Sequence, residues 1–141
     1  MSTKGDLVLD ASTIVAYALG EEGSIDIGQA MMACIERGSR LMVPDLVYNE
    51  VANALLKARF RGLMPEGTIV STLNTIWKLP LESVRQNREL LVRASEISQE
   101  SRLAIYDTVY IACAEREKAI LLTCDKKQYD KATKYCSATI V

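Results

Sequence analysis

The sequence predicts an α/β fold in which a parallel sheet of four or five short strands carries helices on both faces. Apolar runs of roughly four to six residues alternate with helical segments along the whole chain, which is typical of βαβ units. Hydrophobic residues make up 49% and charged residues 25% of the 141 residues, as in an average soluble globular protein. A chain of this length suits one domain, so we expect residues 1–141 to form a single domain.

In the first half of the chain, apolar runs alternate with residues that end helices and strands. Four of the predicted segments are followed directly by a glycine or a proline, which ends them. These segments are a strand over 6–10, a helix over about 11–19, a helix over 24–37, a strand over 41–43 and a helix over 45–61 that is capped by Asp45.

The second half of the chain continues the same alternation. Pro65 suits the first turn of a helix over 65–78, and Ser83 with Gln86 forms a capping box for a helix that ends near residue 101. The other predicted segments are a strand over 79–82, a helix over 107–118, a strand over 119–124, a helix that begins near Asp125 and a last strand over 137–141.

Histidine is absent from the sequence, and this excludes several kinds of catalysis. A Ser-His-Asp triad, a Cys-His dyad, a His-pair ribonuclease and most zinc hydrolases need a histidine. The 17 Lys and Arg against 18 Asp and Glu give a net charge of −1, so nucleic acid would have to be bound by a local basic patch. Catalysis is therefore left to carboxylates, Lys, Tyr, Ser, Thr, Cys or a bound cation.

The cysteines and the amino-terminal sequence favour a reduced, cytoplasmic protein. No two of the four cysteines form a CxxC pair, and Cys113 and Cys124 are expected to be small buried apolar residues. The first ten residues do not resemble a signal peptide. The longest nearly uncharged runs, of about 13 residues, are shorter than the ~20 that span a bilayer, so we expect no membrane segment.

Three aspartates stand in places where a carboxylate is unusual. Asp10 is the sole charged residue of segment 7–19, and Asp107 is the sole charged residue of segment 103–114. Ionised carboxylates in apolar surroundings cost several kcal/mol unless a cation or hydrogen bonds compensate them. Asp10 and Asp125 each end a predicted strand, at the edge where a parallel α/β sheet binds its ligand. These positions indicate a functional site.

A structural explanation of the same acids stays open at this point. Asp10, Asp107 and Asp125 each stand where a helix begins, and Asp is a favoured N-cap residue. Glu50 lies between the polar and the apolar sides of its predicted helix, a context that by itself predicts an exposed surface residue.

Four motifs in order along the chain resemble the PIN-domain family, in particular its VapC-type toxin ribonucleases. They are LVLDASTIVAYAL with Asp10 and Ser12, VPDLVYNEVANALLKA with Glu50, LAIYDTVYIACAERE with Asp107, and LLTCDKKQYDKA with Thr123 and Asp125. In two places the sequence departs from the family: Ser12 stands where many members have Asn, and no Arg-bearing sequence follows Asp125.

The resemblance implies a single PIN-like domain and an endoribonuclease that hydrolyses single-stranded RNA. It implies that Asp10, Glu50, Asp107 and Asp125 form the catalytic and metal-binding set, with Ser12 and Thr123 in support. A site built from carboxylate oxygens alone suits one or two hard cations, Mg²⁺ or Mn²⁺. Such a cation would also relieve a repulsion of about 4 kcal/mol between two carboxylates about 4 Å apart.

Partners follow partly from the residues and partly from the resemblance. Two basic patches of the protein are candidates for binding RNA, one at Lys57, Arg59 and Arg61 and one that includes Lys126 and Lys127. Each of them is equally well explained as the solvated face of a helix. The resemblance implies a homodimer and a small antitoxin protein, for which the apolar residues of segment 65–78 offer a contact if they are not core.

Two other classes of α/β protein also have an acid directly after the first strand. A haloacid-dehalogenase-like phosphatase needs a second Asp two residues further on, and a response-receiver domain needs an acid pair, whereas Ser12 stands at this position. The remaining alternative is a catalytically silent PIN-fold module that binds proteins.

Overall fold

A computed structural model describes residues 5–141, which contain seven helices and one sheet of five strands. Residues 1–4, the start of the predicted domain, lie outside the described residues. All strands are parallel in the order β3-β2-β1-β4-β5, which confirms the predicted α/β fold. Their bounds are Leu7–Leu9 for β1, Leu41–Pro44 for β2, Glu82–Val84 for β3, Ile120–Thr123 for β4 and Ser137–Ile140 for β5.

The central strand β1 explains why the first apolar run is so short and so uniform. Leu7, Val8 and Leu9 are fully buried, because β1 pairs with β2 on one edge and β4 on the other while helices cover both faces. A parallel strand covered in this way needs apolar side chains at every position rather than at alternate ones.

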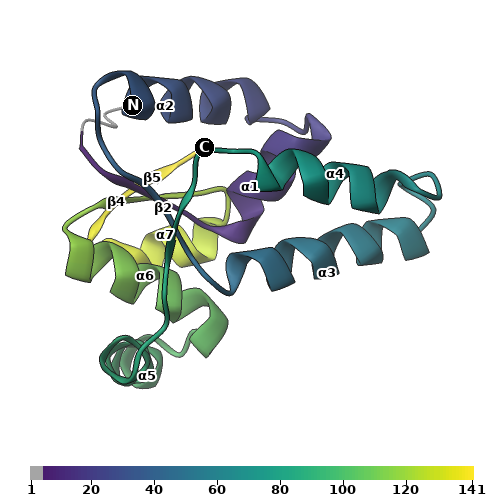
Figure 1. Ribbon diagram of the computed structural model, residues 1–141. Coiled ribbons are helices and arrows are strands. Elements are labelled where there is room, and N and C mark those ends of the chain that lie inside the picture. The colour runs from purple at the N-terminus through teal and green to yellow at the C-terminus, as the bar shows by residue number, and fades with distance from the viewer. Residues whose placement is uncertain (1–4) are drawn as a thin grey trace.

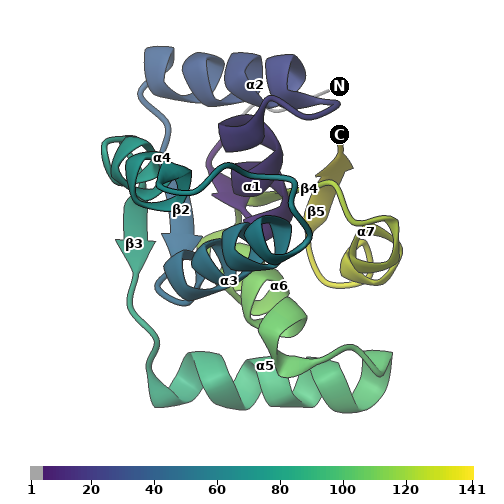
Figure 2. The same cartoon turned by 90° about the vertical axis from the view of Figure 1, so that its right-hand side faces the viewer.

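Helices cover both faces of the sheet, as predicted (Figures 1 and 2). Helices α1 (Ala11–Leu19) and α2 (Ser24–Glu36) lie on one side, and α6 (Ile105–Glu117) lies on the other. Helix α5 (Arg88–Ser101) packs on the outside of α6, and α7 (Lys126–Ala132) packs against β4 and β5. Because α6 lies between the sheet and another helix, residues 108–114 are all buried.

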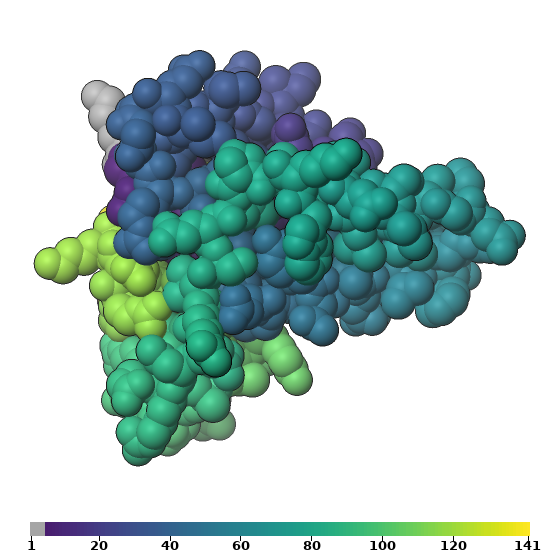
Figure 3. Space-filling model, in the orientation of Figure 1, coloured from purple at the N-terminus to yellow at the C-terminus, as the bar shows by residue number. Residues whose placement is uncertain are grey.

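Helices α3 (Val47–Phe60) and α4 (Thr68–Trp77) run side by side and project from the sheet (Figure 1). In the space-filling view their far ends form a protrusion (Figure 3). The rings of Tyr48 and Trp77, with centroids 4.1 Å apart, join the near ends of the two helices. Val47, Val51 and Leu55 line the inner side of α3 and are fully buried, so the helix is anchored in the core.

The strand predicted over 79–82 is displaced, and the capping box after it is wrong. The N–H of Leu81 donates to the carbonyl of Leu79 at 2.8 Å, so these residues form a tight turn rather than a strand. Ser83 lies inside β3, in register with Val43 of β2. Helix α5 is instead capped by Asn87, whose side chain accepts from the N–H of Leu90 at 2.8 Å.

Two further helix starts differ from the predicted ones. Asp45 does not cap α3, because the N-cap residue is Leu46 and no side chain accepts from the first N–H groups of the helix. The N–H of Asp45 donates to the carbonyl of Val84 at 3.1 Å and so extends the pairing of β2 with β3. Pro65 precedes α4 in a turn closed by the Thr68 hydroxyl, which donates to the Pro65 carbonyl at 2.7 Å.

The cysteines match the expectation in part. All four are free thiols, Cys113 is buried as predicted, and Cys124 is only partly buried. Across the described part of the chain, no helix has both the length and the apolar character needed to cross a membrane.

Candidate active site

The predicted site lies where the strand order changes direction. The chain adds β2 and β3 on one side of β1 and then returns to place β4 on the other side. At such a point the loops after the two neighbouring strands diverge and leave a crevice at their carboxyl ends. Asp10 directly follows β1, and Asp125 stands two residues after the end of β4.

Asp10 is buried, with 4% of its surface exposed, and both of its carboxylate oxygens accept hydrogen bonds. Oδ1 accepts from the Thr13 N–H at 3.0 Å and from the Ser12 hydroxyl at 2.6 Å, and Oδ2 accepts from the Thr123 hydroxyl at 2.5 Å. Burial raises the pKa of Asp10, and the two hydroxyls oppose this shift. Asp10 therefore caps α1 and also forms part of the crevice.

Ser12 and Thr123, predicted as supporting residues, join the ends of β1 and β4. The Ser12 hydroxyl accepts from the Cys124 N–H at 3.0 Å, and the Thr123 hydroxyl accepts from the Asp125 N–H at 3.0 Å. Each hydroxyl thus donates to Asp10 and accepts from the β4–α7 loop. The two together hold Asp10 and Asp125 in fixed relative positions.

Asp107 lies in the first turn of α6 but does not cap it. The N-cap is Ala104, and the Asp107 carboxylate accepts no hydrogen bond from any described residue. Burial, followed by the negative charge of Asp125, raises the pKa of Asp107, while the Lys127 cation lowers it. The capping explanation thus holds for Asp10 and Asp125 and is wrong for Asp107.

Glu50 is half-buried in the first turn of α3, which corrects the exposed position expected from its sequence context alone. Its Oε1 accepts a hydrogen bond of 2.5 Å from the Tyr110 hydroxyl. Burial raises the pKa of Glu50, as do the negative charges of Asp107 and Asp10, while the hydrogen bond from Tyr110 lowers it. Glu50 therefore faces two of the other acids.

The four predicted acids line one pocket of about 190 Å³. They come from four separate segments and share the pocket with Ala11, Ser12, Tyr110 and Gln128. Within residues 5–141, neither a Lys nor an Arg side chain lines this pocket, and none of the four acids forms an ion pair. The pocket thus concentrates negative charge, and among the described residues the nearby cation that acts on these acids is Lys127, which lies outside the pocket and affects Asp107.

The chemistry of this donor set fits a hard divalent cation. All available donors are oxygens, which Mg²⁺ and Mn²⁺ prefer, and no imidazole is present to favour zinc. Among the described residues, no three His, Cys, Asp or Glu side chains already stand in the arrangement of a metal site. The four carboxylates would therefore have to close in around an ion that enters the pocket.

Sequence reasoning missed Gln128, a buried residue of the pocket with 2% exposure. Its side-chain amide donates to the backbone carbonyl of Asp107 at 3.0 Å, and its N–H donates to Asp125 Oδ1 at 3.2 Å. Gln128 thus links α7 to α6. The available signal was its spacing of four from Ala132, which puts both residues on the buried side of a short helix.

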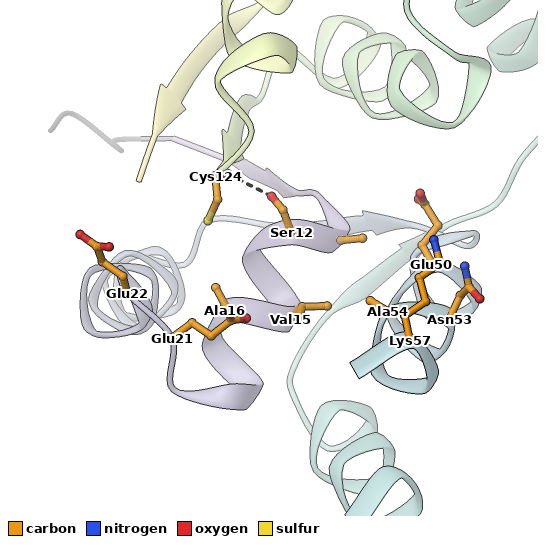
Figure 4. Close-up of a pocket in the computed structure, with 11 residues that line it drawn as sticks. Ser12, Val15, Ala16, Glu21, Glu22, Glu50, Asn53, Ala54, Lys57 and Cys124 are labelled. Carbon is orange, nitrogen blue, oxygen red and sulfur yellow. Dashed lines mark hydrogen bonds between the residues drawn. The ribbon is translucent and has the colours of Figure 1, made fainter. Parts of the chain in front are cut away.

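A larger groove of about 560 Å³ leads away from the acids between α1 and α3 (Figure 4). Ser12 and Glu50 belong to both the groove and the acid pocket, and Asn53 and Lys57 lie further along α3. A second hollow of about 500 Å³ continues past Lys57 to Arg61. The acid pocket, the groove and the second hollow thus adjoin one another through shared lining residues, and Glu21 and Glu22 line the α1 side of the groove opposite the two cations.

The predicted RNA-binding residues divide into those that line this groove and those that do not. Lys57 and Arg61 line it, whereas Arg59 lies 3.9 Å from Glu66 and does not. On α7, Lys126 forms an ion pair with Asp130, and Lys127 is exposed close to Asp107. The two basic patches therefore remain on different helices, α3 and α7.

Comparisons with known proteins agree with this fold. A Ribonuclease VapC3 from Pyrobaculum aerophilum is 32% identical over 126 residues, which cover 89% of this chain and 93% of the relative. The crystal structure of PAE2754 from Pyrobaculum aerophilum superimposes with a TM-score of 0.71 at 20% identity, covering 98% of this chain and 92% of that one.

Two further structures share the fold. A toxin-antitoxin complex from Klebsiella pneumoniae matches with a TM-score of 0.59 and 17% identity over 88% of this chain and 90% of that one. The structure of FitAB bound to an IR36 DNA fragment matches with a TM-score of 0.68 and 12% identity, covering 95% of this chain and 94% of that one. The family model described as PIN domain matches residues 7–134. The chain therefore belongs to the PIN-domain family, among its VapC-type members.

Proposed function

We propose that this protein is a metal-dependent endoribonuclease that hydrolyses phosphodiester bonds of single-stranded RNA. The observation that carries the proposal is the convergence of Asp10, Glu50, Asp107 and Asp125 on one pocket that no Lys or Arg of residues 5–141 lines. The name of the Pyrobaculum aerophilum relative, a ribonuclease, supports the same reaction class. The absence of histidine agrees with hydrolysis that does not use imidazole as acid or base.

The four acids would hold Mg²⁺ or Mn²⁺, as one or two ions. Such a bound ion would neutralise charge on the phosphoryl oxygens and acidify the attacking water. Asp107 is free to bind a ligand because it accepts no hydrogen bond from the described residues. Asp10, whose two oxygens accept from Ser12 and Thr123, would keep its orientation while Asp107 adjusts to the ion.

RNA would lie along the groove between α1 and α3. Lys57 and Arg61 are spaced one helical turn apart on the α3 side and would contact successive phosphates. Lys127, near Asp107, would contact the strand on the other side of the acids, whereas Lys126 and Arg59 are engaged by acidic neighbours. Such a path would run from Arg61 past Lys57 to Glu50, the acid that lines both the groove and the acid pocket.

We further propose that the protein is the cytoplasmic toxin of a toxin-antitoxin pair, a homodimer, and one domain over residues 1–141. The structural neighbour from Klebsiella pneumoniae, a toxin-antitoxin complex, supports an antitoxin partner. Of the apolar residues predicted for such a contact, Ile76 is buried in the core, Ile69 and Leu73 are partly buried, and Trp77 is 64% exposed. Val70, which is 66% exposed, and Trp77 are therefore the apolar residues of α4 that remain open to a partner.

A cleavage assay tests the proposed reaction. Purified protein is incubated with single-stranded RNA in the presence of Mg²⁺, Mn²⁺ or a chelator, beside Asp10→Asn, Asp107→Asn and Asp130→Asn variants. We expect cleavage only with a cation, and a loss of about a hundredfold or more in the first two variants. Asp130→Asn is the matched control, since Asp130 is exposed and lies outside the pocket.

Cleavage that survives the chelator, or that persists in both pocket variants, would contradict the proposal. Thermal unfolding supplies a second readout, since a cation at 100 times its Kd stabilises the folded state by about 2.7 kcal/mol. For a domain of this size we expect the melting temperature to rise by roughly 5–10 °C. Neither cleavage nor a shift in melting temperature would indicate the catalytically silent PIN-fold module instead.

A further inference from the structure

We propose that Tyr110 is a positioning residue, which holds the Glu50 carboxylate in the acid pocket so that all four acids can bind one cation. This inference rests on the proposed function, because it concerns the same metal site. It concerns a residue outside the four acids, whose side chain would act on the cation only through Glu50.

The geometry begins with the placement of Tyr110 on α6. Tyr110 follows Asp107 by three residues, so the two side chains lie on the same side of the helix and both line the pocket. Tyr110 is 2% exposed and lies within the seven successive buried residues of α6. A tyrosine ring packed in this way has its hydroxyl direction set by the core.

Glu50 depends on this hydroxyl for its orientation. The Tyr110 hydroxyl donates to Glu50 Oε1 at 2.5 Å, and among the described residues it is the one hydrogen bond that the Glu50 carboxylate accepts. A glutamate side chain has three rotatable bonds, so a single hydrogen bond selects one arrangement out of several. Oε2 accepts no hydrogen bond from the described chain and remains available to a ligand.

Two of the other acids, Asp10 and Asp125, are already held by hydrogen bonds, and Asp107 has a shorter side chain with one rotatable bond fewer than Glu50. Asp10 has a short side chain held by three donors, and the Asp125 carboxylate accepts from two backbone N–H groups of α7. Glu50 is the longest of the four side chains and is repelled by two of the others, Asp107 and Asp10. Without Tyr110, this repulsion would turn the Glu50 carboxylate out of the pocket toward the adjoining groove, which it also lines.

The test is the affinity for Mn²⁺, measured by calorimetry on the purified protein without RNA. We expect Tyr110→Phe to raise the Kd for Mn²⁺ by about tenfold, the size found when a partner of a metal ligand is removed. Tyr135→Phe is the matched control, because the Tyr135 hydroxyl donates to Glu100 at 2.6 Å on the surface, away from the pocket. We expect its Kd to equal that of the wild type.

A double-variant comparison separates positioning from a general effect on folding. If Tyr110 acts through Glu50, Tyr110→Phe weakens Mn²⁺ binding in the wild type but adds no further loss to Glu50→Ala. A merely structural effect of Tyr110 would weaken binding equally in both backgrounds. Glu50→Asp tests the same contact without altering the core, since the shorter side chain keeps its charge but withdraws from the hydroxyl. We expect this variant also to raise the Kd.

The outcomes distinguish this inference from the function on which it rests. A wild-type protein that binds no Mn²⁺ would overturn both together. A wild type that binds Mn²⁺, with Tyr110→Phe binding equally well or losing affinity just as much in the Glu50→Ala background, would overturn the positioning role alone. Tenfold weaker binding by Tyr110→Phe, absent from the Glu50→Ala background, would establish the role.

Discussion

The hydroxyl of Thr123 donates a hydrogen bond of 2.5 Å to Oδ2 of Asp10, across 113 positions of the sequence. This contact joins the carboxyl ends of β1 and β4, the two strands between which the order of the sheet changes direction. Thr123 is fully buried and Asp10 nearly so, so water does not replace the bond. The contact brings the first and the fourth sequence motif to one place.

Replacing Thr123 by Val tests this contact with almost no change in side-chain shape. Loss of the hydroxyl leaves Asp10 Oδ2 without a donor, so we expect the pKa of Asp10 to rise further and stability at neutral pH to fall by about 1–3 kcal/mol. Chemical denaturation measures the change. Thr133→Val is the control, because Thr133 is exposed, and equal effects of the two variants would contradict the argument.

The stability of the protein without metal should depend on pH through Asp107. Burial and the charge of Asp125 raise the pKa of Asp107 above its ordinary value of 3.8. A carboxyl group whose pKa is higher in the folded than in the unfolded chain destabilises the fold once it ionises. As the pH rises through the raised pKa, the wild type should therefore lose stability relative to Asp107→Asn.

Denaturation of both proteins in chelator, between pH 4 and pH 7.5, measures this difference. Asp130→Asn, which also removes one negative charge but outside the pocket, is the control. We expect the free energy of unfolding of Asp107→Asn to gain on that of the wild type as the pH rises. If the wild type instead gains stability relative to Asp107→Asn, the argument from a buried, unpaired carboxylate is wrong.

Gln128 should matter both to stability and to cleavage. In Gln128→Leu, the hydrogen bond from the side-chain amide to the Asp107 carbonyl is lost, and we expect a cost of about 1–3 kcal/mol together with a clear reduction in kcat. Gln99→Leu on the exposed side of α5 is the matched control. A Gln128→Leu protein as active as the wild type would show that the link between α6 and α7 is dispensable.

The helix cap of α5 gives a test of the fold that is independent of function. Asn87→Ala removes the side-chain acceptor of the Leu90 N–H and should lower the free energy of unfolding by about 1 kcal/mol. Ser83→Ala is the control, because the exposed Ser83 lies in β3 and caps nothing. A larger loss for Ser83→Ala than for Asn87→Ala would favour the capping box over the structure.

Lys57 and Arg61 should contribute to RNA binding through charge. The slope of log K against log salt for single-stranded RNA is negative, and its magnitude should decrease by about 0.7 for each phosphate contact removed. Lys57→Ala and Arg61→Ala should each show this decrease in a catalytically inactive Asp10→Asn background. Lys78→Ala, an exposed lysine outside the groove, should leave the slope unchanged. Equal slopes for all variants would place the RNA elsewhere.

Much of the fold follows from the local sequence, because short uniform apolar runs such as Leu7–Leu9 have no stable place except a strand covered on both faces. The helix starts that were predicted wrongly depend on pairing with a distant strand, and local sequence patterns hold no information about such pairing. Ser83 satisfies a capping pattern, but pairing with Val43 of β2 places it in a strand. Likewise, the N–H of Asp45 continues the sheet instead of beginning a helix.

The candidate site could be predicted in so far as its carboxylates stand in unusual sequence surroundings. Asp10 and Asp107 stand alone in apolar segments, and Asp125 follows a strand. Glu50 has no such local signal, because its partner Tyr110 is 60 positions away and only the fold brings the two together. The spacing of Gln128 from Ala132 indicates a buried side of the helix, but the partner of its amide, a carbonyl of another helix, is set by the fold alone.

The helix that carries Asp107 and Tyr110 is buried at seven successive positions, residues 108–114, and a change of side-chain volume at any of them would disturb its neighbours. Repacking this stretch would require matching changes in the sheet on one side and in α5 on the other. Asn53 and Lys57 on the groove wall are exposed and meet no such packing constraint.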